Sequence, residues 1–162
     1  MSAAADSPIK ISLDFLNKTP FAKELGFEIL NAERGFICLR FNPQERFLNH
    51  LGTCQAGAIF ALSEITGGLL CGTFLDLDKN FLITKKAGIS FDNIADSVLI
   101  SEASLPEEKI NEVILLLNRK RKIDFDVAVL IKDDKGRQIS KGQNSYYVRL
   151  GIPRSFISRR RG

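Results

Sequence analysis

One long segment of this chain is apolar almost all the way round when it is read as a helix. It runs roughly from Gln55 to Thr73, and large apolar residues alternate in it with many small ones. The small ones are Ala56, Gly57, Ala58, Ala61, Ser63, Gly67, Gly68 and Gly72. A helix that is apolar on every side belongs in a core, and small residues let other backbone approach it closely. We therefore expect a central helix wrapped by a sheet rather than laid on one of its faces.

A single carboxylate, Glu64, interrupts this apolar segment. Removing a carboxylate from water is costly unless it is paired, hydrogen-bonded or protonated, so its position asks for an explanation. Two explanations stay open: a catalytic base or nucleophile, and a structural carboxylate held by a lysine or by hydrogen bonds. The polar, glycine-punctuated stretch that begins at Asn49 runs directly into the same helix. Together they form the only plausible catalytic constellation of the sequence.

Alternation of apolar and polar residues predicts six antiparallel strands around this helix. Two of them lie within residues 27–41 and are joined by a turn at Glu33-Arg34-Gly35. The other four are expected at Phe81–Phe91, Val98–Leu105, Ile123–Ile131 and Arg137–Leu150. Asp133-Asp134-Lys135-Gly136 is typical of a hairpin turn between the last two.

Start and stop signals predict two short helices before the first strand. Ser7-Pro8 is typical of a helix N-terminus, and that helix is expected to end near Asn17. Thr19-Pro20 repeats the signal, and Gly26 supplies the stop. We expect both pieces to pack on the outside of the core.

A further helix is predicted between the fourth and fifth strands, over residues 106–122. Ser104 and Glu107 form a candidate capping box. An apolar stripe follows at Ile110, Val113, Ile114 and Leu117. Acidic residues open the segment and basic residues close it, which complements the helix dipole. This structural reason for the basic residues is preferred to phosphate binding.

The composition is that of one globular domain. The chain has 162 residues, of which 44% are hydrophobic and 26% charged, and its formal net charge is +4. Part of that charge lies in Arg159-Arg160-Arg161, which we interpret as a solvated terminus rather than a contact to nucleic acid or membrane. We divide the chain into an extension with a short helix (residues 1–18), the main domain (19–150) and a basic tail (151–162).

Localisation and metal content follow from what the sequence lacks. The start, MSAAADSPIK, has no signal-peptide pattern, and no run approaches the ~20 apolar residues of a membrane span, so we expect a cytoplasmic protein. Cys38, Cys54 and Cys71 have no CxxC spacing, and His50 is the only histidine, so neither a metal site nor a disulfide is expected. A Cys54–His50 nucleophile is disfavoured because it has no recognisable third partner.

The order of these elements resembles that of the hotdog-fold acyl-CoA thioesterases, in particular the phenylacetate-pathway type and its uncharacterised relatives. The resemblance rests on the Pro-Phe-x-Lys-x-Leu-Gly entry at residues 20–26, the loop Asn49-His50-Leu51-Gly52, and then Gly57 and Glu64. It covers roughly residues 19–150. It implies an α+β hotdog fold, in which a sheet of about six antiparallel strands curls around a central helix. It also implies a homodimer or a dimer of dimers, with the active site at the dimer interface.

The resemblance further implies roles for individual residues. Glu64 would activate water or attack the thioester of an acyl-CoA, and Asn49 from the other subunit would position water or substrate. Thr84 falls where some members of the group carry an assisting hydroxyl. Lys85 and Lys86, expected on alternate faces of their strand, are either contacts to coenzyme A phosphates or solvated edge charges. No cofactor is implied beyond the coenzyme A thioester itself, and no nucleic acid partner.

The start of the central helix carries the remaining candidates. Free backbone N–H groups around Ala56 and Gly57 are suitable donors to a thioester oxygen that gains negative charge. Where the family usually has His-Gly-Gly, this chain has Gln55-Ala56-Gly57, so a titratable group and one glycine are missing. Two non-enzymatic alternatives therefore stay open. One is a protein that binds acyl-CoA or an acyl carrier without turnover, and the other is a structural dimer module.

Overall fold

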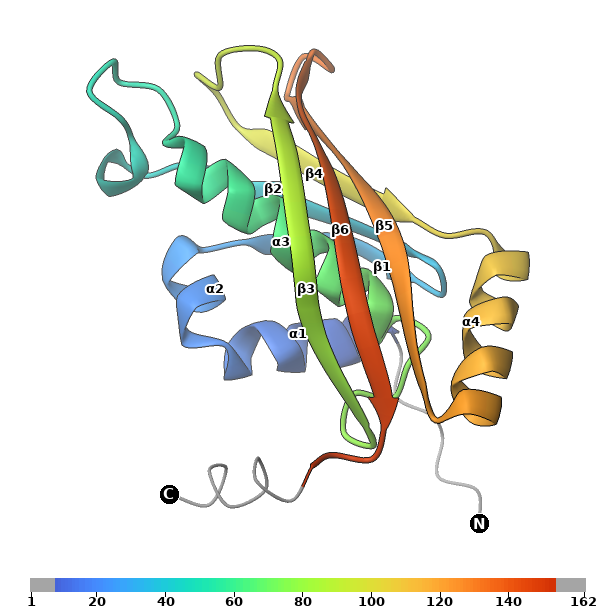
Figure 1. The fold of residues 1–162 in the computed structure, drawn as a ribbon. Helices are drawn as coiled ribbons and strands as arrows, with labels where there is room; N and C mark the ends of the chain where they lie inside the picture. Colours follow the sequence, from blue (N-terminus) through green and yellow to red (C-terminus); the bar gives the residue numbers. More distant parts are fainter. Residues whose placement is uncertain (1–7, 154–162) are drawn as a thin grey trace.

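The structure, a computed structural model, describes residues 8–153 and contains one six-stranded antiparallel sheet in the order β1-β2-β4-β5-β6-β3 (Figure 1). The strands are β1 (Glu28–Glu33), β2 (Phe36–Phe41), β3 (Asn80–Phe91), β4 (Leu99–Ser104), β5 (Lys122–Asp133) and β6 (Gln138–Leu150). All six predicted strands are confirmed, with ends within two residues of those expected. The sheet order places β3 at one edge and β1 at the other.

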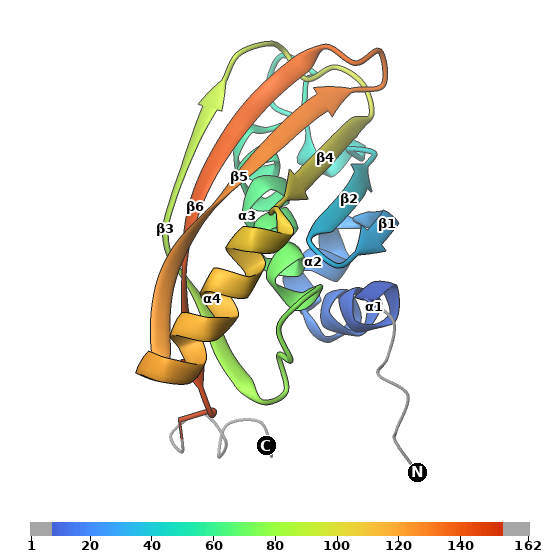
Figure 2. The same cartoon turned by 90° about the vertical axis from the view of Figure 1, so that its right-hand side faces the viewer.

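The central helix α3 (Ala56–Gly72) lies inside the curl of this sheet (Figure 2). Thirteen of its 17 residues are buried, and it contacts the five neighbouring strands from β2 to β3. The prediction of a helix wrapped by a sheet is therefore confirmed. The small residues let the strands approach the helix closely. At Gly67, for example, a Cβ atom would lie closer than 3.0 Å to the hydroxyl of Tyr146 on β6, so only glycine fits there.

The inner face of the sheet supplies the rest of the core. On β5 the inward positions are Phe125, Val127, Val129 and Ile131, all buried. The turn into β6 uses Gly136 at φ +80°, a left-handed conformation that glycine adopts without strain. The Asp133 to Gly136 hairpin turn is thus where the sequence predicted it.

Two helices precede the sheet, α1 (Pro8–Lys18) and α2 (Pro20–Leu25). Gly26 ends α2 at φ +73°, and α1 packs against β1 and α3. Ser7 and the basic run Arg159-Arg160-Arg161, for which roles were predicted, lie outside the described residues. Within residues 8–153, no helix has both the length and the apolar character needed to cross a membrane.

The helix α4 (Glu107–Lys120) packs against β5 and β6 through the predicted stripe, of which Ile110, Val113 and Leu117 are buried. The predicted capping box is wrong. Pro106 occupies the N-cap position without any side-chain cap, because Ser104 is still paired with Phe36 in the sheet. The Glu107 carboxylate instead accepts hydrogen bonds from the Arg34 guanidinium, 3.2 Å away.

Candidate functional site

The carboxylate of Glu64 meets the hydroxyl of Thr84, 20 residues further along the chain. Glu64 lies on the side of α3 that faces β3 and is half-buried, and Thr84 Oγ1 donates a hydrogen bond to Glu64 Oε1. Among residues 8–153, no lysine or arginine pairs with this carboxylate. The structural explanation through a lysine partner thus has no support in the described residues, and the structure brings Glu64 and Thr84 into contact.

The backbone next to this carboxylate is bonded to β6. Tyr146 donates its hydroxyl hydrogen to the Glu64 carbonyl oxygen at 2.7 Å, and Asn144 Nδ2 donates to the Ser63 carbonyl oxygen at 3.1 Å. Neither β6 residue was among the predicted site residues. A signal was present, because Asn144 and Tyr146 take inward positions of a strand and a buried polar side chain there needs a partner.

Asn49 organises its own loop. Its Oδ1 accepts hydrogen bonds from the N–H groups of Leu51 (2.9 Å) and Thr53 (3.2 Å), and its Nδ2 donates to Thr53 Oγ1 at 2.8 Å. No hydrogen bond joins Asn49 to Glu64 in the part of the chain that the structure describes. One amide hydrogen of Asn49 is left over after these bonds.

The start of α3 presents backbone donors to solvent. Gln55, Ala56 and Gly57 are all exposed, and the Gln55 side chain makes no cap. The first N–H groups of a helix have no partner within it, and those of Ala56 and Gly57 donate to no other described residue. Because a helix rises 1.5 Å per residue, Ala56 lies about 12 Å from Glu64 along the axis. The two groups of one chain are thus too far apart to act on the same thioester carbon.

The prediction that Lys85 and Lys86 lie on alternate faces is wrong. The pairing of β3 with β6 shifts between Thr84 and Lys86, so Lys85 is the extra residue of a β-bulge. Both lysines then line one hollow on the outer face of the sheet. Lys85 forms an ion pair with Asp124 at 2.7 Å. Lys86 makes no ion pair with any described residue.

Cysteine chemistry does not contribute to this site. Burial raises the pKa of Cys54 to about 11, so its thiol is protonated near neutral pH. His50, four residues earlier, is exposed. Burial likewise raises the pKa values of Cys38 and Cys71, both of which are buried.

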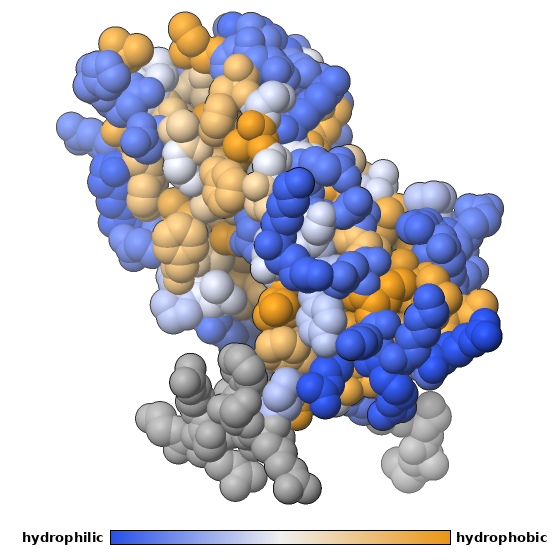
Figure 3. Space-filling model, in the orientation of Figure 1, coloured by the Kyte–Doolittle hydropathy of each residue, from blue (hydrophilic) through white to orange (hydrophobic). Residues whose placement is uncertain are grey.

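The edge strand next to Glu64 carries an apolar surface. β3 is 12 residues long, and among residues 8–153 it pairs only with β6, so no described strand pairs with its other side. Three large apolar side chains are exposed on or beside it, Phe60 on α3 and Ile83 and Phe91 on β3. Figure 3 shows apolar surface over β3 and the N-terminal half of α3. Natural sheets usually protect or pair such a long edge.

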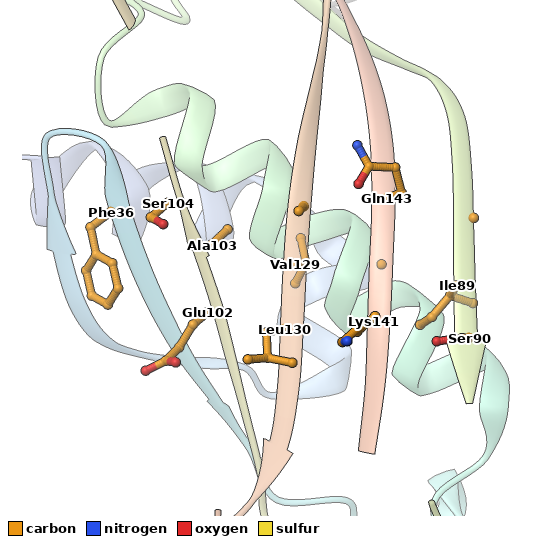
Figure 4. A pocket seen from close by; sticks show the side chains of 13 residues that line it. Phe36, Ile89, Ser90, Glu102, Ala103, Ser104, Val129, Leu130, Lys141 and Gln143 are labelled. Carbon is orange, nitrogen blue, oxygen red and sulfur yellow. The ribbon is translucent and has the colours of Figure 1, made fainter. Parts of the chain in front are cut away.

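A second groove lies on the other side of the sheet. It has a volume of about 720 Å³ and is lined by residues of five strands, β2 to β6, among them the outward-facing Glu102, Leu130 and Lys141. Figure 4 shows these side chains in front of the strands, with α3 behind them. Glu64 lies under the inner face, so this groove is not the site of the carboxylate.

Comparison with known proteins agrees with the fold. A family described as a domain of unknown function, DUF4442, has a sequence model that matches residues 10–148. No curated protein sequence matches the chain. The Pseudomonas aeruginosa protein PA5026, described as a protein of unknown function and probable thioesterase, has a similar structure with a TM-score of 0.80 and 23% identity. That match covers 92% of this chain and 99% of PA5026.

Two further solved structures are similar. The Escherichia coli PaaI protein, from the phenylacetic acid degradation operon, has a TM-score of 0.69 at 14% identity, over 89% of this chain and 94% of PaaI. A thioesterase family protein from Silicibacter pomeroyi has a TM-score of 0.73 at 14% identity, over 90% of this chain and all of that one (100%). At such identities the likeness is one of fold, and it confirms the predicted hotdog fold.

Proposed function

This chain belongs to the DUF4442 family, and we propose that it hydrolyses acyl-CoA or related acyl thioesters in a pocket at a homodimer interface. The observation that carries this proposal is the contact between Thr84 and Glu64. A half-buried carboxylate on a core helix, oriented by a hydroxyl and paired with no cation among residues 8–153, is suited to act as a base or nucleophile.

Thr84 leaves one oxygen of the carboxylate available for chemistry. It donates to Oε1, and Oε2 accepts no hydrogen bond from the described residues. In the proposed reaction Oε2 takes a proton from water while the water oxygen bonds to the thioester carbon. The carbon–sulfur bond then breaks, and the proton passes to the departing thiolate. Direct attack of Oε2 on the same carbon, followed by hydrolysis of the anhydride, is the nucleophilic version.

A second copy of the chain would complete the site. The Ala56 and Gly57 N–H groups are suited to bind the thioester oxygen, but they lie about 12 and 10 Å along the helix from Glu64 of the same chain. Pairing of two copies along the free edge of β3 would bury Phe60 and Ile83. It would also bring the helix start of one copy toward the carboxylate of the other. A dimer of dimers is compatible with the same arrangement.

The remaining candidate residues have supporting roles in the proposal. Asn49 has one amide hydrogen left for substrate or water, and the rest of its side chain keeps the loop in shape. Lys86 is better placed than Lys85 to meet a coenzyme A phosphate, because Lys85 is already paired with Asp124. Gln55 is exposed beside the proposed oxyanion donors. Water is the only co-substrate, and no cofactor takes part in the proposal.

One observation favours a second candidate function. Ala56 places a methyl group beside the proposed oxyanion donors, and Gln55 cannot change charge. A protein that binds acyl-CoA or an acyl carrier protein through this pocket, without turnover, would keep the fold and the dimer. A structural dimer module would keep only the interface.

Thiol release separates these functions. Purified protein is incubated with acyl-CoAs of several chain lengths, and the rate of free thiol release is compared with that of Glu64→Gln. A matched control is Glu102→Gln, a half-buried carboxylate on the outer face. We expect release by the wild type and the control, and its loss in Glu64→Gln. Equal rates for wild type and Glu64→Gln would refute the role of Glu64. Saturable binding without release would establish the binding protein, and the absence of both would leave the structural module.

A further inference from the structure

The strand next to β3 bonds to the backbone of α3 at the residue that carries the carboxylate. Three inward positions of β6 meet one turn of the helix. Asn144 donates to the Ser63 carbonyl oxygen at 3.1 Å, and Tyr146 donates to the Glu64 carbonyl oxygen at 2.7 Å. At the third position, a Cβ on Gly142 would lie closer than 3.0 Å to Ser63 Oγ. At Gly142, therefore, the helix lies too close to the strand for the strand to carry a side chain.

The hydroxyl of Tyr146 is sterically enclosed. A Cβ on Gly67 would lie closer than 3.0 Å to this hydroxyl, and only 1% of Tyr146 is exposed. Burial raises the pKa of Tyr146 far above its ordinary value, so the hydroxyl stays protonated and acts as a donor. The hydroxyl therefore donates to the Glu64 carbonyl oxygen at neutral pH.

Tyr146 also lies directly opposite Thr84 in the pairing of β6 with β3. Both side chains donate hydrogen bonds to Glu64, one to its main chain and one to its carboxylate. Tyr146 bonds to the main-chain oxygen of Glu64, and Thr84 bonds to its carboxylate. Since the sheet fixes Tyr146 relative to Thr84, the carbonyl bond constrains the rotation of α3 relative to the Thr84 hydroxyl, in addition to the packing of the core.

We propose that Tyr146 is a positioning residue, whose bond to the Glu64 carbonyl oxygen keeps the carboxylate against Thr84. Its effect on catalysis rests on the proposed thioesterase function. Helix Cα atoms lie about 2.3 Å from the axis and a Glu carboxylate extends several Å further, so a rotation of roughly 10° moves the carboxylate by about 1 Å. A displacement of about 1 Å can lower a rate by a factor on the order of 10².

The first test compares Tyr146→Phe with Tyr147→Phe. The Tyr146 variant keeps the ring and loses the hydroxyl. Tyr147 is the next residue, faces outward opposite Asp124, and undergoes the same chemical change. We expect Tyr146→Phe to lower kcat of thiol release about tenfold or more with KM within about twofold, and Tyr147→Phe to behave as the wild type. Unchanged kcat in Tyr146→Phe would overturn the inference.

A second variant separates positioning from general loosening of the helix. Thr66 bonds to Ser101 at 2.7 Å, a buried contact between α3 and β4. Thr66→Val removes that contact without touching Glu64, so we expect lower thermal stability and unchanged kcat. An equal loss of kcat in Thr66→Val and Tyr146→Phe would contradict a specific role for Tyr146. In a Thr84→Val background, Tyr146→Phe should have a smaller effect than alone, since both act on one contact.

A crystal structure of Tyr146→Phe tests the inference independently of activity. We expect the bond between Thr84 Oγ1 and the Glu64 carboxylate to be broken or displaced. Finding that bond unchanged would overturn the positioning role. If instead wild type and Glu64→Gln release thiol equally, the proposed role of Glu64 in catalysis fails, and the crystal structure still decides whether Tyr146 positions Glu64.

Discussion

Thr84 on β3 lies opposite Tyr146 on β6, and both donate a hydrogen bond to Glu64. The Thr84 hydroxyl is the only described donor to the carboxylate. Thr84→Val should therefore lower kcat about tenfold or more, because a hydrogen bond to a charged group is worth about 1.5 to 3 kcal/mol. Thr84→Ser keeps a hydroxyl and should stay within a few-fold of the wild type. Steady-state thiol release measures both, and equal activity of Thr84→Val and Thr84→Ser would remove Thr84 from the mechanism.

The apolar edge predicts a dimer that a single charge disrupts. Phe60 is 39% exposed on α3 beside β3. Burying an aspartate in an interface is costly, so Phe60→Asp should sediment as a monomer in analytical ultracentrifugation while the wild type sediments as a dimer or tetramer. Leu115→Asp is the matched control, because Leu115 is 66% exposed on α4 and should not affect association. A monomeric wild type at micromolar concentration would contradict the proposed interface.

Adjacent glycines of α3 should respond to alanine in opposite directions. A Cβ on Gly67 would collide with Tyr146, whereas a Cβ on Gly68 would sit 3.9 Å from the same ring, an ordinary contact. Gly67→Ala should therefore lose about 1 to 3 kcal/mol of unfolding free energy, as overpacked cores do. Gly68→Ala should gain up to about 1 kcal/mol from helix propensity. Urea denaturation measures the unfolding free energies of both variants. Similar effects at the two positions would show that Tyr146 on β6 does not limit the space at Gly67.

Acid should weaken the β5–β6 turn through Asp133, which is only 3% exposed. Burial raises its pKa, but hydrogen bonds from Arg137 and from the N–H groups of Arg137 and Lys135 lower it more, so the net pKa is below the ordinary value. A depressed folded-state pKa stabilises the protein above the unfolded-state value of about 3.9, and that stability is lost as pH falls through the folded-state pKa.

The measurement is the unfolding free energy between pH 6 and pH 2. Asp133→Asn lacks the titrating group, so it should be less stable than the wild type at pH 6 and lose less stability on acidification. A wild type and Asp133→Asn with parallel pH profiles would show that Asp133 contributes nothing to acid unfolding.

The three cysteines should be inert in the native protein. Burial raises the pKa of Cys54 to about 11, so only about one thiol in a thousand is ionised at pH 8. We expect no fast reaction with a thiol reagent before denaturation and three reactive groups after it. Cys54→Ser should leave thiol release from acyl-CoA unchanged. Loss of thiol release in Cys54→Ser would instead support a catalytic Cys54–His50 nucleophile.

Local sequence patterns predicted the elements well because each strand and helix follows from spacing along a few residues. Turn chemistry did the same at Gly136, whose left-handed φ is a local property. The capping box failed because Ser104 is held in the sheet by Phe36, a residue far away in the sequence. The placement of Lys85 and Lys86 failed for a similar reason, since a bulge exists only in the pairing of two strands.

What the sequence by itself determined was the buried helix, its single carboxylate and the alternating strands that enclose it. Periodicity and the cost of burying a charge are sufficient for those conclusions. Only the tertiary structure decided what the carboxylate meets. Thr84 and Tyr146 reach Glu64 from strands 20 and 82 residues further along the chain, and Asn49 bonds within its own loop. Such contacts depend on strand register and helix rotation, which follow from the packing of the whole core and not from any short stretch of sequence.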